Sequence, residues 1–430
     1  MSDETRRLTV ASLARVEGEG ALSVTIQDGR VTSSQLQIYE PPRFFEAFLR
    51  DRAFTEVADI TSRICGICPV AYQTSALQAV EDACGYVVPR EVAELRRLLY
   101  CGEWISSHAL HIYLLHAPDF LGHPDVISLA RSDRAAVERG LALKKVGNAV
   151  LEAVGGRAIH PVNARVGGFY RAPTRSELTP LAEQLREALD LALATVDWVS
   201  GFDFPDVELT HELLAVVEPD RYAIENGTLA TASGDTFTPA QFLDHVEEHH
   251  LPHTTALQAT LDGHLYLTGP LARYSISSGL LSPLAREAAA RAGLGDTCRN
   301  PFRSVIVRAV EVVYAVEEAL RIIEGYRRPE TPSPEVEPRA GVGHGVSEAP
   351  RGLLYHRYEL AGDGLVRAAR IIPPTSQNQA VIEDDLRRLV QSRLGLDDEV
   401  LTHLCERTIR NYDPCISCAT HFLRLTVTGR

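Results

Sequence analysis

Two Cys-x-x-Cys pairs lie near opposite ends of this 430-residue chain, and they constrain its fold more than any other feature. One pair is Cys65 and Cys68 in RICGICP, and the other is Cys415 and Cys418 in DPCISCATH. The spacing lets both sulfurs of a pair face one centre, and thiolates prefer zinc, iron and other late transition metals to magnesium or calcium. If all four sulfurs bind one centre, the two ends of the chain must meet in space. We therefore expect a single domain over 1–430 with interleaved ends.

The composition limits the classes of function. The formal net charge is −14 and no basic face is evident, which disfavours nucleic-acid binding. The sequence has no uncharged apolar run long enough for a membrane span, and the polar, charged segment 1–15 is unlike a secretory signal. Eight cysteines in such a chain indicate a reducing compartment, where thiols serve metal binding or catalysis. We expect a cytoplasmic protein.

The pattern of the remaining chain predicts an α+β fold, mainly α, with a central bundle of long helices and peripheral β-hairpins. The hairpins are expected around Asp28-Gly29 and Asp363-Gly364, which are favoured turn dipeptides. Residues 209–268 combine short strands with turns, and residues 327–352, rich in proline and glycine, are expected to form an extended, ordered loop. Helices are expected over 69–83, 91–116, 132–154, 179–200, 283–292, 301–325, 379–394 and 398–410.

Two simpler interpretations of the cysteines are a structural four-cysteine zinc site and a thioredoxin-like redox pair. A zinc ribbon usually keeps its pairs within tens of residues of each other, whereas 346 residues separate Cys68 from Cys415. A thioredoxin-like site needs only one pair, on a βαβ unit. Both interpretations therefore fit less well than a shared centre that the whole fold assembles.

The two cysteine motifs resemble those of the large, catalytic subunit of nickel-iron hydrogenases. The resemblance extends along nearly the whole chain and implies the fold of that subunit and its reaction, the reversible heterolytic cleavage of H2 to protons and electrons. The cysteine motifs are highly specific, and the segments between them occur in the order of the family. These segments are RVEGEG (15–20), FFEAF (44–48), SHALHIYLLHAPDF (107–120), GGRAIHP (155–161), EAPRG (348–352) and PPTSQN (373–378).

The resemblance implies a nickel-iron centre on the four cysteines. By matching position, Cys65 and Cys415 would be terminal ligands of nickel, while Cys68 and Cys418 would bridge nickel to an iron that carries carbon monoxide and cyanide. Heterolysis of H2 needs a metal with an open position and a base beside it. A terminal thiolate such as Cys415 can be that base, and the Arg351 side chain above the open position is a second candidate.

The resemblance also implies side chains around the centre. Arg351, in EAPRG, matches the arginine over the active site, and its donor geometry suits a cyanide or an incoming ligand. Asp119 matches a carboxylate near that arginine that would fix its orientation, although a helix-end cap is an alternative role. Thr375, in PPTSQN, would donate to the other cyanide, and Pro374 would pack beside it.

Proton transfer requires a titratable group at the edge of the site, because each H2 yields two protons. Glu17, in RVEGEG, matches the carboxylate that carries protons away from the terminal cysteine. Glu19 would share a face with Glu17 if this segment were a strand, so geometry alone leaves it as an alternative. A solvated charge is the simpler interpretation for either residue.

A magnesium ion below the centre is also implied by the resemblance. Glu46 and His421 match the side chains that hold it, together with the main-chain carbonyl of Ile371 and water. One carboxylate with neutral ligands and water suits a hard cation that keeps part of its hydration.

Two departures from the family pattern bear on the subgroup and on maturation. Many relatives carry histidine four residues after Cys68, where this chain has Tyr72. This variant is similar to the cytoplasmic branch that is coupled to NAD(P) or reduces sulfur. In the family, a maturation endopeptidase often cuts just after the last histidine, so the residues after His421 form either a removable tail or a retained strand.

Partner subunits are expected, because the electrons from H2 must leave one at a time. The remaining cysteines have no ferredoxin-like spacing, and GVGHGV (341–346) lacks the strand-to-helix setting of a nucleotide motif. An iron-sulfur small subunit is therefore expected, with a flavin-containing NAD(P) reductase module. The four cysteines outside the two paired motifs, which lack ferredoxin-like spacing, are Cys84, Cys101, Cys298 and Cys405.

Two other classes of function compete with a hydrogen-activating enzyme. A noncatalytic subunit like the related component of complex I would have lost the metal cysteines, and all four are present here. A structural zinc protein would keep the cysteines but contain zinc alone. Metal analysis separates these alternatives.

Overall fold

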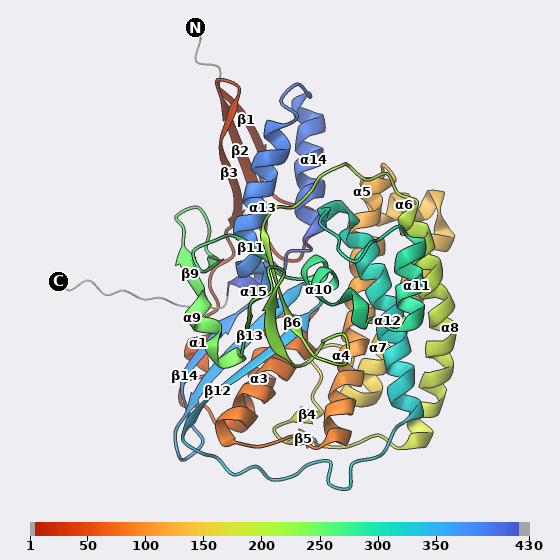
Figure 1. Cartoon of the computed structure of the whole chain (residues 1–430), viewed down its shortest axis with the longest axis vertical. Helices are drawn as coiled ribbons and strands as arrows, with labels where there is room; N and C mark the ends of the chain where they lie inside the picture. The colour runs from red at the N-terminus through yellow and green to blue at the C-terminus, as the bar shows by residue number, and fades with distance from the viewer. Residues whose placement is uncertain (1–4, 421–430) are drawn as a thin grey trace, which may run out of the picture.

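The computed structural model describes residues 5–420 and places a bundle of long helices beside several small sheets (Figure 1). The bundle confirms the predicted α+β fold that is mainly α. The most buried of its helices is α12, which is enclosed along most of its length, as expected for a helix that is apolar on nearly all sides. The long helices are α4 (Arg90–Leu110), α7 (Arg134–Gly155), α8 (Arg175–Ser200) and α12 (Ser304–Glu324).

The helix predicted over 91–116 ends earlier than expected, because α4 passes into a π-helical turn at His111–His116. The turn holds two buried histidines against the end of a later helix. Nε2 of His111 lies 2.8 Å from the carbonyl oxygen of Arg410, and Nε2 of His116 lies 2.9 Å from Oδ1 of Asn411. These histidines therefore serve packing and hydrogen bonding, and π-helical turns of this kind are frequent near functional sites.

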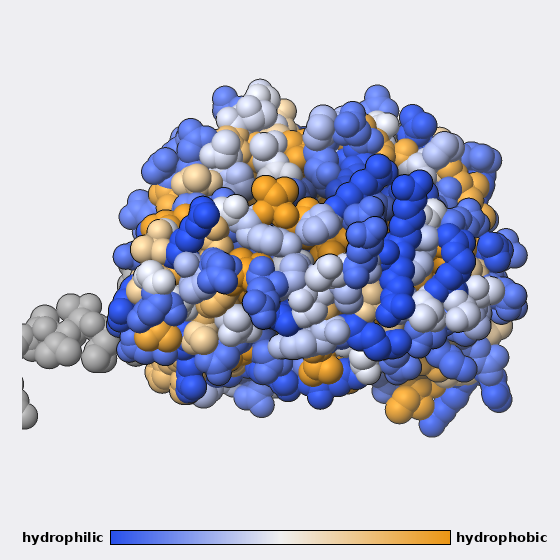
Figure 2. Space-filling view, turned by 90° about the horizontal axis from the view of Figure 1, so that it is seen from below, coloured by the Kyte–Doolittle hydropathy of each residue, from blue (hydrophilic) through white to orange (hydrophobic). Residues whose placement is uncertain are grey.

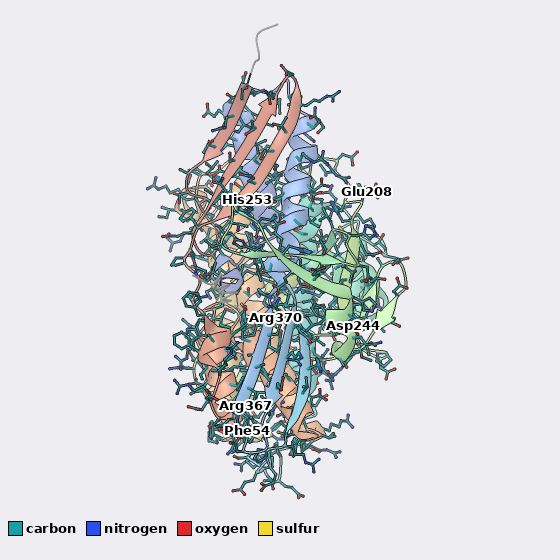
Figure 3. All side chains as sticks on the ribbon, turned by 90° about the vertical axis from the view of Figure 1, so that its left-hand side faces the viewer. Phe54, Glu208, Asp244, His253, Arg367 and Arg370 are labelled. Atoms are coloured by element: carbon teal, nitrogen blue, oxygen red, sulfur yellow. The ribbon has the colours of Figure 1, made fainter. Side chains whose placement is uncertain are left out.

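Two three-stranded antiparallel sheets stand on the side of the molecule away from the bundle (Figure 3). They confirm both predicted hairpins, whose turns contain the positive-φ residues Asp28, Gly29 and Gly364. The expectation of a loop over 327–352 is wrong for its second half, which forms strand β12 of the β12–β13–β14 sheet. The strands are β1 (Thr5–Val10), β2 (Gly20–Gln27), β3 (Arg30–Ile38), β12 (Gly341–Ala349), β13 (Gly352–Leu360) and β14 (Val366–Ile372).

Glycines explain this strand, because they allow β12 to lie directly on helix α3 (Pro69–Cys84). A Cβ atom on Gly343 would come within 1.9 Å of the carbonyl oxygen of Ala79. A Cβ atom on Gly345 would come within 2.1 Å of that of Ser75. Alternate positions of the strand thus face successive turns of the helix, so GVGHGV is a packing motif. Because Cys68 is the N-cap of α3 and EAPRG lies at the end of β12, this contact places the first cysteine pair close to EAPRG.

The remaining elements surround this frame. Helix α13 (Pro374–Gln391) begins five residues before its predicted start, and α14 (Asp398–Asn411) follows it beside the β1–β3 sheet (Figure 1). The predicted mixed region forms short strands: β6 (Glu212–Val217), β7 (Thr228–Thr231), β8 (Thr236–Phe237), β9 (Val246–His250), β10 (Leu257–Leu261) and β11 (Tyr266–Leu267). A further short pair is β4 (Ala164–Arg165) and β5 (Gly168–Phe169). The shorter helices are α1 (Phe45–Phe48), α2 (Val57–Ser62), α5 (Ala117–Phe120), α6 (Val126–Ser132), α9 (Phe242–His245), α10 (Pro270–Ser277), α11 (Pro283–Arg291) and α15 (Ile416–Ala419).

The described part of the chain contains no helix that could span a membrane. None of its helices combines the length and the apolar character that crossing a bilayer requires. The face seen from below is mostly hydrophilic, with small and separate hydrophobic groups (Figure 2). Scattered apolar groups of this kind are normal on protein surfaces.

Candidate metal centre

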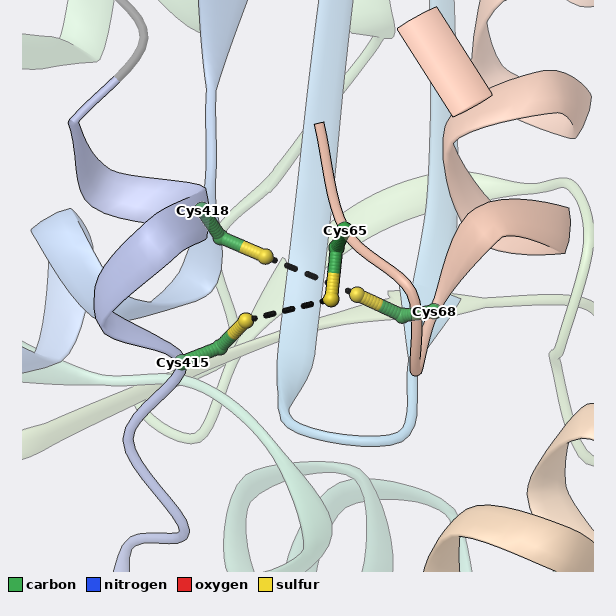
Figure 4. Close-up of side chains that lie close together, drawn as sticks. All are labelled: Cys65, Cys68, Cys415 and Cys418. Carbon is green, nitrogen blue, oxygen red and sulfur yellow. Dashed lines mark hydrogen bonds between the residues drawn. The ribbon is translucent and has the colours of Figure 1, made fainter. Parts of the chain in front are cut away.

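The four paired cysteines meet at one buried point between α3 and α15 (Figure 4). Sγ of Cys65 lies 3.4 Å from Sγ of Cys415, and Sγ of Cys68 lies 3.5 Å from Sγ of Cys418. All four sulfurs lie within 4.8 Å of one another, and every one of these residues is buried. Cysteines from near the two ends of the chain thus lie together in a single cluster.

The local backbone turns each cysteine towards the cluster. Cys68 is the N-cap of α3, and the main-chain N–H of Ile67 donates to Sγ of Cys65 at 3.3 Å. On the other segment, the main-chain N–H of Cys415 donates to Oγ1 of Thr375 at 2.9 Å. Thr375 and Pro374 are both buried in the first turn of α13. The early start of α13 therefore brings PPTSQN to the second cysteine pair.

Arg43 joins the two cysteine segments and is a residue that sequence analysis missed. Its Nη2 donates at 2.6 Å to the carbonyl oxygen of Ile64, just before Cys65, and also to that of Ser417, just before Cys418. One guanidinium thus holds together loops that are far apart in sequence. Because its partners are main-chain carbonyls, no residue pattern could have identified this role.

The chemistry of the cluster suits soft divalent metals. Burial raises the pKa values of Cys415 and Cys418, whereas the hydrogen bond with Cys415 lowers the pKa of Cys65. Four thiolates this close together repel one another unless a cation lies between them, and the nearby charge of Arg351 compensates only part of that repulsion. Late transition metals supply the missing positive charge and bind thiolate strongly. The donor set therefore fits a nickel-iron centre.

Arg351 is fully buried beside the sulfurs. Its Nε donates to the carbonyl oxygen of Asp413 at 2.9 Å, and its Nη2 donates to Oδ1 of the same residue at 3.2 Å. Its Nη1 is also buried and has no hydrogen-bond partner within residues 5–420. Burial opposes the charged form, but Asp413 and the cysteines outweigh it and raise the pKa of Arg351. The guanidinium is thus fixed at one end and keeps one donor for a further ligand.

The prediction that Asp119 orients Arg351 is wrong. Asp119 accepts from Nε and Nη2 of Arg410 at 2.7 and 2.9 Å, and it also pairs with Arg15. Asp413 orients Arg351 instead, as a residue of the second cysteine motif itself. The Asp119 carboxylate ties Arg15, the first residue of RVEGEG, to Arg410 on α14, and this contact could not be recognised from sequence spacing.

A buried cation fixes the main chain of EAPRG. Nη1 of Arg273 donates to the carbonyl oxygen of Ala349 at 2.9 Å, and Nη2 donates to that of Pro350 at 3.1 Å. Arg273 also pairs with Glu311 at 2.7 Å and with Glu348 at 3.0 Å. The positive charge of Arg273 is thus paired with carboxylates inside the protein, which offsets the cost of burying it. This anchor positions the residue that follows, Arg351.

Glu17 reaches the cluster, and Glu19 does not bond to it. Oε2 of Glu17 lies 3.2 Å from Sγ of Cys415 and accepts from the main-chain N–H of Ser417 at 3.0 Å. Burial, and next the charge of Cys65, raise the pKa of Glu17. Glu19 is exposed, and its main-chain N–H donates to a different carboxylate. A protonatable, half-buried carboxylate thus lies next to Cys415, between the cluster and the solvent.

The predicted magnesium ligands are brought together in part. Oε1 of Glu46, on α1, accepts from the main-chain N–H of Ile371 at 2.8 Å, so this carboxylate lies beside the predicted carbonyl ligand. His421 lies outside the described residues. The magnesium site therefore stays a prediction.

Tyr72 lies in the wall of the cluster. The side chain is buried, and its ring centroid is 5.6 Å from that of His356. Burial, and next the charge of Cys418, raise the pKa of Tyr72 well above its usual value. This position therefore offers a neutral phenol to the cysteines.

A second group with the composition of a metal site consists of His211, Asp384 and Asp385. Nε2 of His211 lies 2.9 Å from Asp384, and this carboxylate also accepts from two arginines one turn along α13. The hydroxyl of Tyr412 donates to Asp385. These partners account for both carboxylates as members of a hydrogen-bond network.

Comparison with known proteins supports the centre. The family model of the nickel-dependent hydrogenases matches residues 43–142 and 278–421. Sulfhydrogenase 1 subunit alpha of Pyrococcus furiosus is 35% identical over 97% of this chain and 98% of its own length. Sulfhydrogenase 2 subunit alpha of the same organism is 33% identical over 96% of this chain and 98% of its own.

Solved structures share the fold. A chain of an NAD+-reducing NiFe-hydrogenase superposes with a TM-score of 0.84 at 27% identity and covers 97% of this chain and 99% of its own. A NiFeSe hydrogenase from Desulfovibrio vulgaris Hildenborough superposes with a TM-score of 0.79 at 22% identity and covers 98% and 100%, respectively. The second likeness concerns the fold alone.

Proposed function

The chain belongs to the nickel-dependent hydrogenase family, and from this premise we propose how its residues divide the work of splitting H2. The chain is the catalytic subunit of a nickel-iron hydrogenase, which cleaves H2 reversibly to protons and electrons. The observation that carries this conclusion is the convergence of four buried sulfurs within 4.8 Å of one another. When bound, the nickel-iron pair supplies the position at which H2 is polarised and cleaved.

The four cysteines are proposed to share the two metals unequally. Cys65 and Cys415 would bind nickel alone, and Cys68 and Cys418 would bind both nickel and an iron that carries carbon monoxide and cyanide. Each of these two proposed pairs joins one cysteine from each segment, with its sulfurs 3.4 Å apart in the terminal pair and 3.5 Å apart in the bridging pair.

Proton removal is proposed to run from Sγ of Cys415 to Glu17. The 3.2 Å separation between Sγ and Oε2 permits direct transfer. The bond from the main-chain N–H of Ser417 keeps the carboxylate in place. Burial favours the neutral acid and so lets Glu17 accept a proton and pass it outward.

Other side chains are proposed to orient the iron ligands. Arg351 keeps its Nη1 donor for a cyanide or for an incoming ligand. Oγ1 of Thr375 accepts from the main chain of Cys415, which leaves its hydroxyl hydrogen to donate to the other cyanide. Pro374 packs beside it and begins α13.

A magnesium ion is proposed beside Glu46, with the carbonyl of Ile371, His421 and water as its other ligands. The support is the contact between Glu46 and the main chain of Ile371. Hard cations prefer such oxygen-rich sets with several waters.

The chain is proposed to act in a cytoplasmic complex with an iron-sulfur small subunit and a flavin-containing NAD(P) reductase module. The likeness to an NAD+-reducing hydrogenase over almost the whole chain supports this assembly. A maturation endopeptidase that acts after His421 would complete the centre.

Metal analysis and catalysis of the purified complex test the proposal. We expect one nickel per chain, iron in excess of nickel because the iron-sulfur small subunit contributes its own iron, and H2-dependent reduction of NAD+ or NADP+. Zinc alone would support the structural alternative, and a metal-free chain without activity would support a noncatalytic subunit.

A further inference from the structure

Helix α3 starts directly at the centre but lacks the usual side-chain cap. Its N-cap is Cys68, whose side chain makes no capping hydrogen bond because its sulfur faces Cys418. Pro69, the first helical residue, has no N–H. The first free donors of the helix are therefore the N–H groups of Val70 and Ala71, and inside a protein such groups must find an acceptor.

A glutamate from the neighbouring helix accepts both of these bonds. Oε2 of Glu103, on α4, lies 2.6 Å from the main-chain nitrogen of Val70, and its Oε1 lies 3.1 Å from that of Ala71. Glu103 is 1% exposed, and no cation pairs with it in the part of the chain that the structure describes. Both oxygens are thus directed at the N-terminus of α3, the positive end of the helix dipole.

We propose that Glu103 is a positioning residue for the metal centre: it caps α3 in place of Cys68 and thereby fixes the direction of the Cys68 sulfur. The inference rests on the proposed ligand role of Cys68. A metal ligand at an N-cap cannot also cap its helix, so the capping group must come from another element. Serine, threonine or aspartate at the cap would satisfy the helix but would not provide a thiolate.

The hydrogen-bonding pattern makes the role of Glu103 distinguishable from simple packing. A glutamine has almost the same volume, but it would turn one N–H2 donor towards an N–H group of the helix. An aspartate is smaller but keeps two carboxyl oxygens as acceptors. If the site needs volume, Glu103→Gln is the milder change. If it needs a cap, Glu103→Asp is the milder change.

Hydrogen exchange of the assembled complex tests the cap without relying on activity. We expect Glu103→Gln to accelerate exchange at the start of α3, in the peptide over residues 66–75, by about tenfold, which corresponds to about 1.4 kcal/mol. Glu103→Asp should accelerate it less. A matched control is Glu81→Gln, which breaks a buried pair with Arg96 at the opposite end of the same helix. The control should leave exchange at residues 66–75 unchanged.

Infrared spectroscopy then tests the link to the centre. The stretching bands of carbon monoxide and cyanide should shift in Glu103→Gln and coincide with those of the wild type in Glu81→Gln. The proposal is overturned if exchange at residues 66–75 is unchanged in Glu103→Gln, if Glu103→Asp is the more damaging variant, or if the bands do not move. Should Glu103→Gln not assemble, Glu103→Asp alone decides: exchange near that of the wild type supports the cap, and complete loss of protection contradicts it.

Discussion

Replacing Glu17 by glutamine should stop proton transfer while leaving the metal centre intact. The glutamine oxygen can still accept from the N–H of Ser417, which is 3.0 Å from Oε2 in the wild type, so the side chain should keep its place. The amide, however, cannot accept a proton from Sγ of Cys415 across the 3.2 Å gap. Loss of a positioned acid or base typically costs a factor of about 10² to 10⁴ in rate. This range corresponds to about 2.7–5.4 kcal/mol of activation free energy.

The assay is H2-dependent reduction of an artificial electron acceptor by the purified complex, with the nickel content measured on the same sample. We expect kcat of Glu17→Gln to fall by the stated factor while the nickel content and the infrared bands stay as in the wild type. Glu19→Gln is the matched control, because Glu19 is exposed and does not bond to the cluster. If Glu17→Gln turns over as fast as the wild type, or if Glu19→Gln loses as much, the proposed proton route is refuted.

Three further outcomes follow. Cys415→Ser should lose nickel and H2 uptake, whereas Cys298→Ser, which alters a buried cysteine outside the cluster, should keep both; retained uptake in Cys415→Ser would contradict the ligand assignment. Gly343→Ala should destabilise the fold by roughly 1–3 kcal/mol or more in chemical unfolding, because its Cβ would meet a helix carbonyl at 1.9 Å, whereas Gly279→Ala, with no atom within 4 Å, should be neutral. Burial raises the pKa of Glu311, but its arginine partner outweighs this and lowers the pKa from 4.5 to about 2. The ionised Glu311 therefore contributes about 3 kcal/mol to the free energy of unfolding at a pH above the pKa that Glu311 has in the unfolded chain. This contribution is lost as the pH falls through the pKa of Glu311 in the folded protein. The melting temperature of Glu311→Gln should therefore fall less on acidification than that of the wild type.

Local patterns in the sequence predicted the parts of the site that depend on spacing and on motif chemistry. The two Cys-x-x-Cys motifs favoured one shared centre, and the four sulfurs meet at one point. Turn dipeptides located both hairpins, and RVEGEG contained the carboxylate that reaches Cys415, although geometry alone had left Glu17 and Glu19 as alternatives.

Contacts between distant segments were beyond prediction from one sequence. Arg43 acts through main-chain carbonyls, and Glu103 acts through main-chain N–H groups, so neither has a partner residue that a pattern could identify. The exchange of Asp119 for Asp413 as the partner of Arg351 depends on how α14 packs, which no local propensity specifies. The sequence predicts a loop at β12 because glycine disfavours an isolated strand, whereas in the structure the glycines allow the strand to pack closely on α3.

An infrared spectrum of the purified complex tests the central claim most directly. Carbon monoxide and cyanide on iron give stretching bands in a region where proteins do not absorb, and their frequencies report on the cysteine ligands. The account predicts such bands, together with one nickel per chain and iron in excess of nickel, because the iron-sulfur small subunit contributes its own iron. A fully matured complex without these bands, or one that contains only zinc, would contradict the claim that the four cysteines hold a nickel-iron centre.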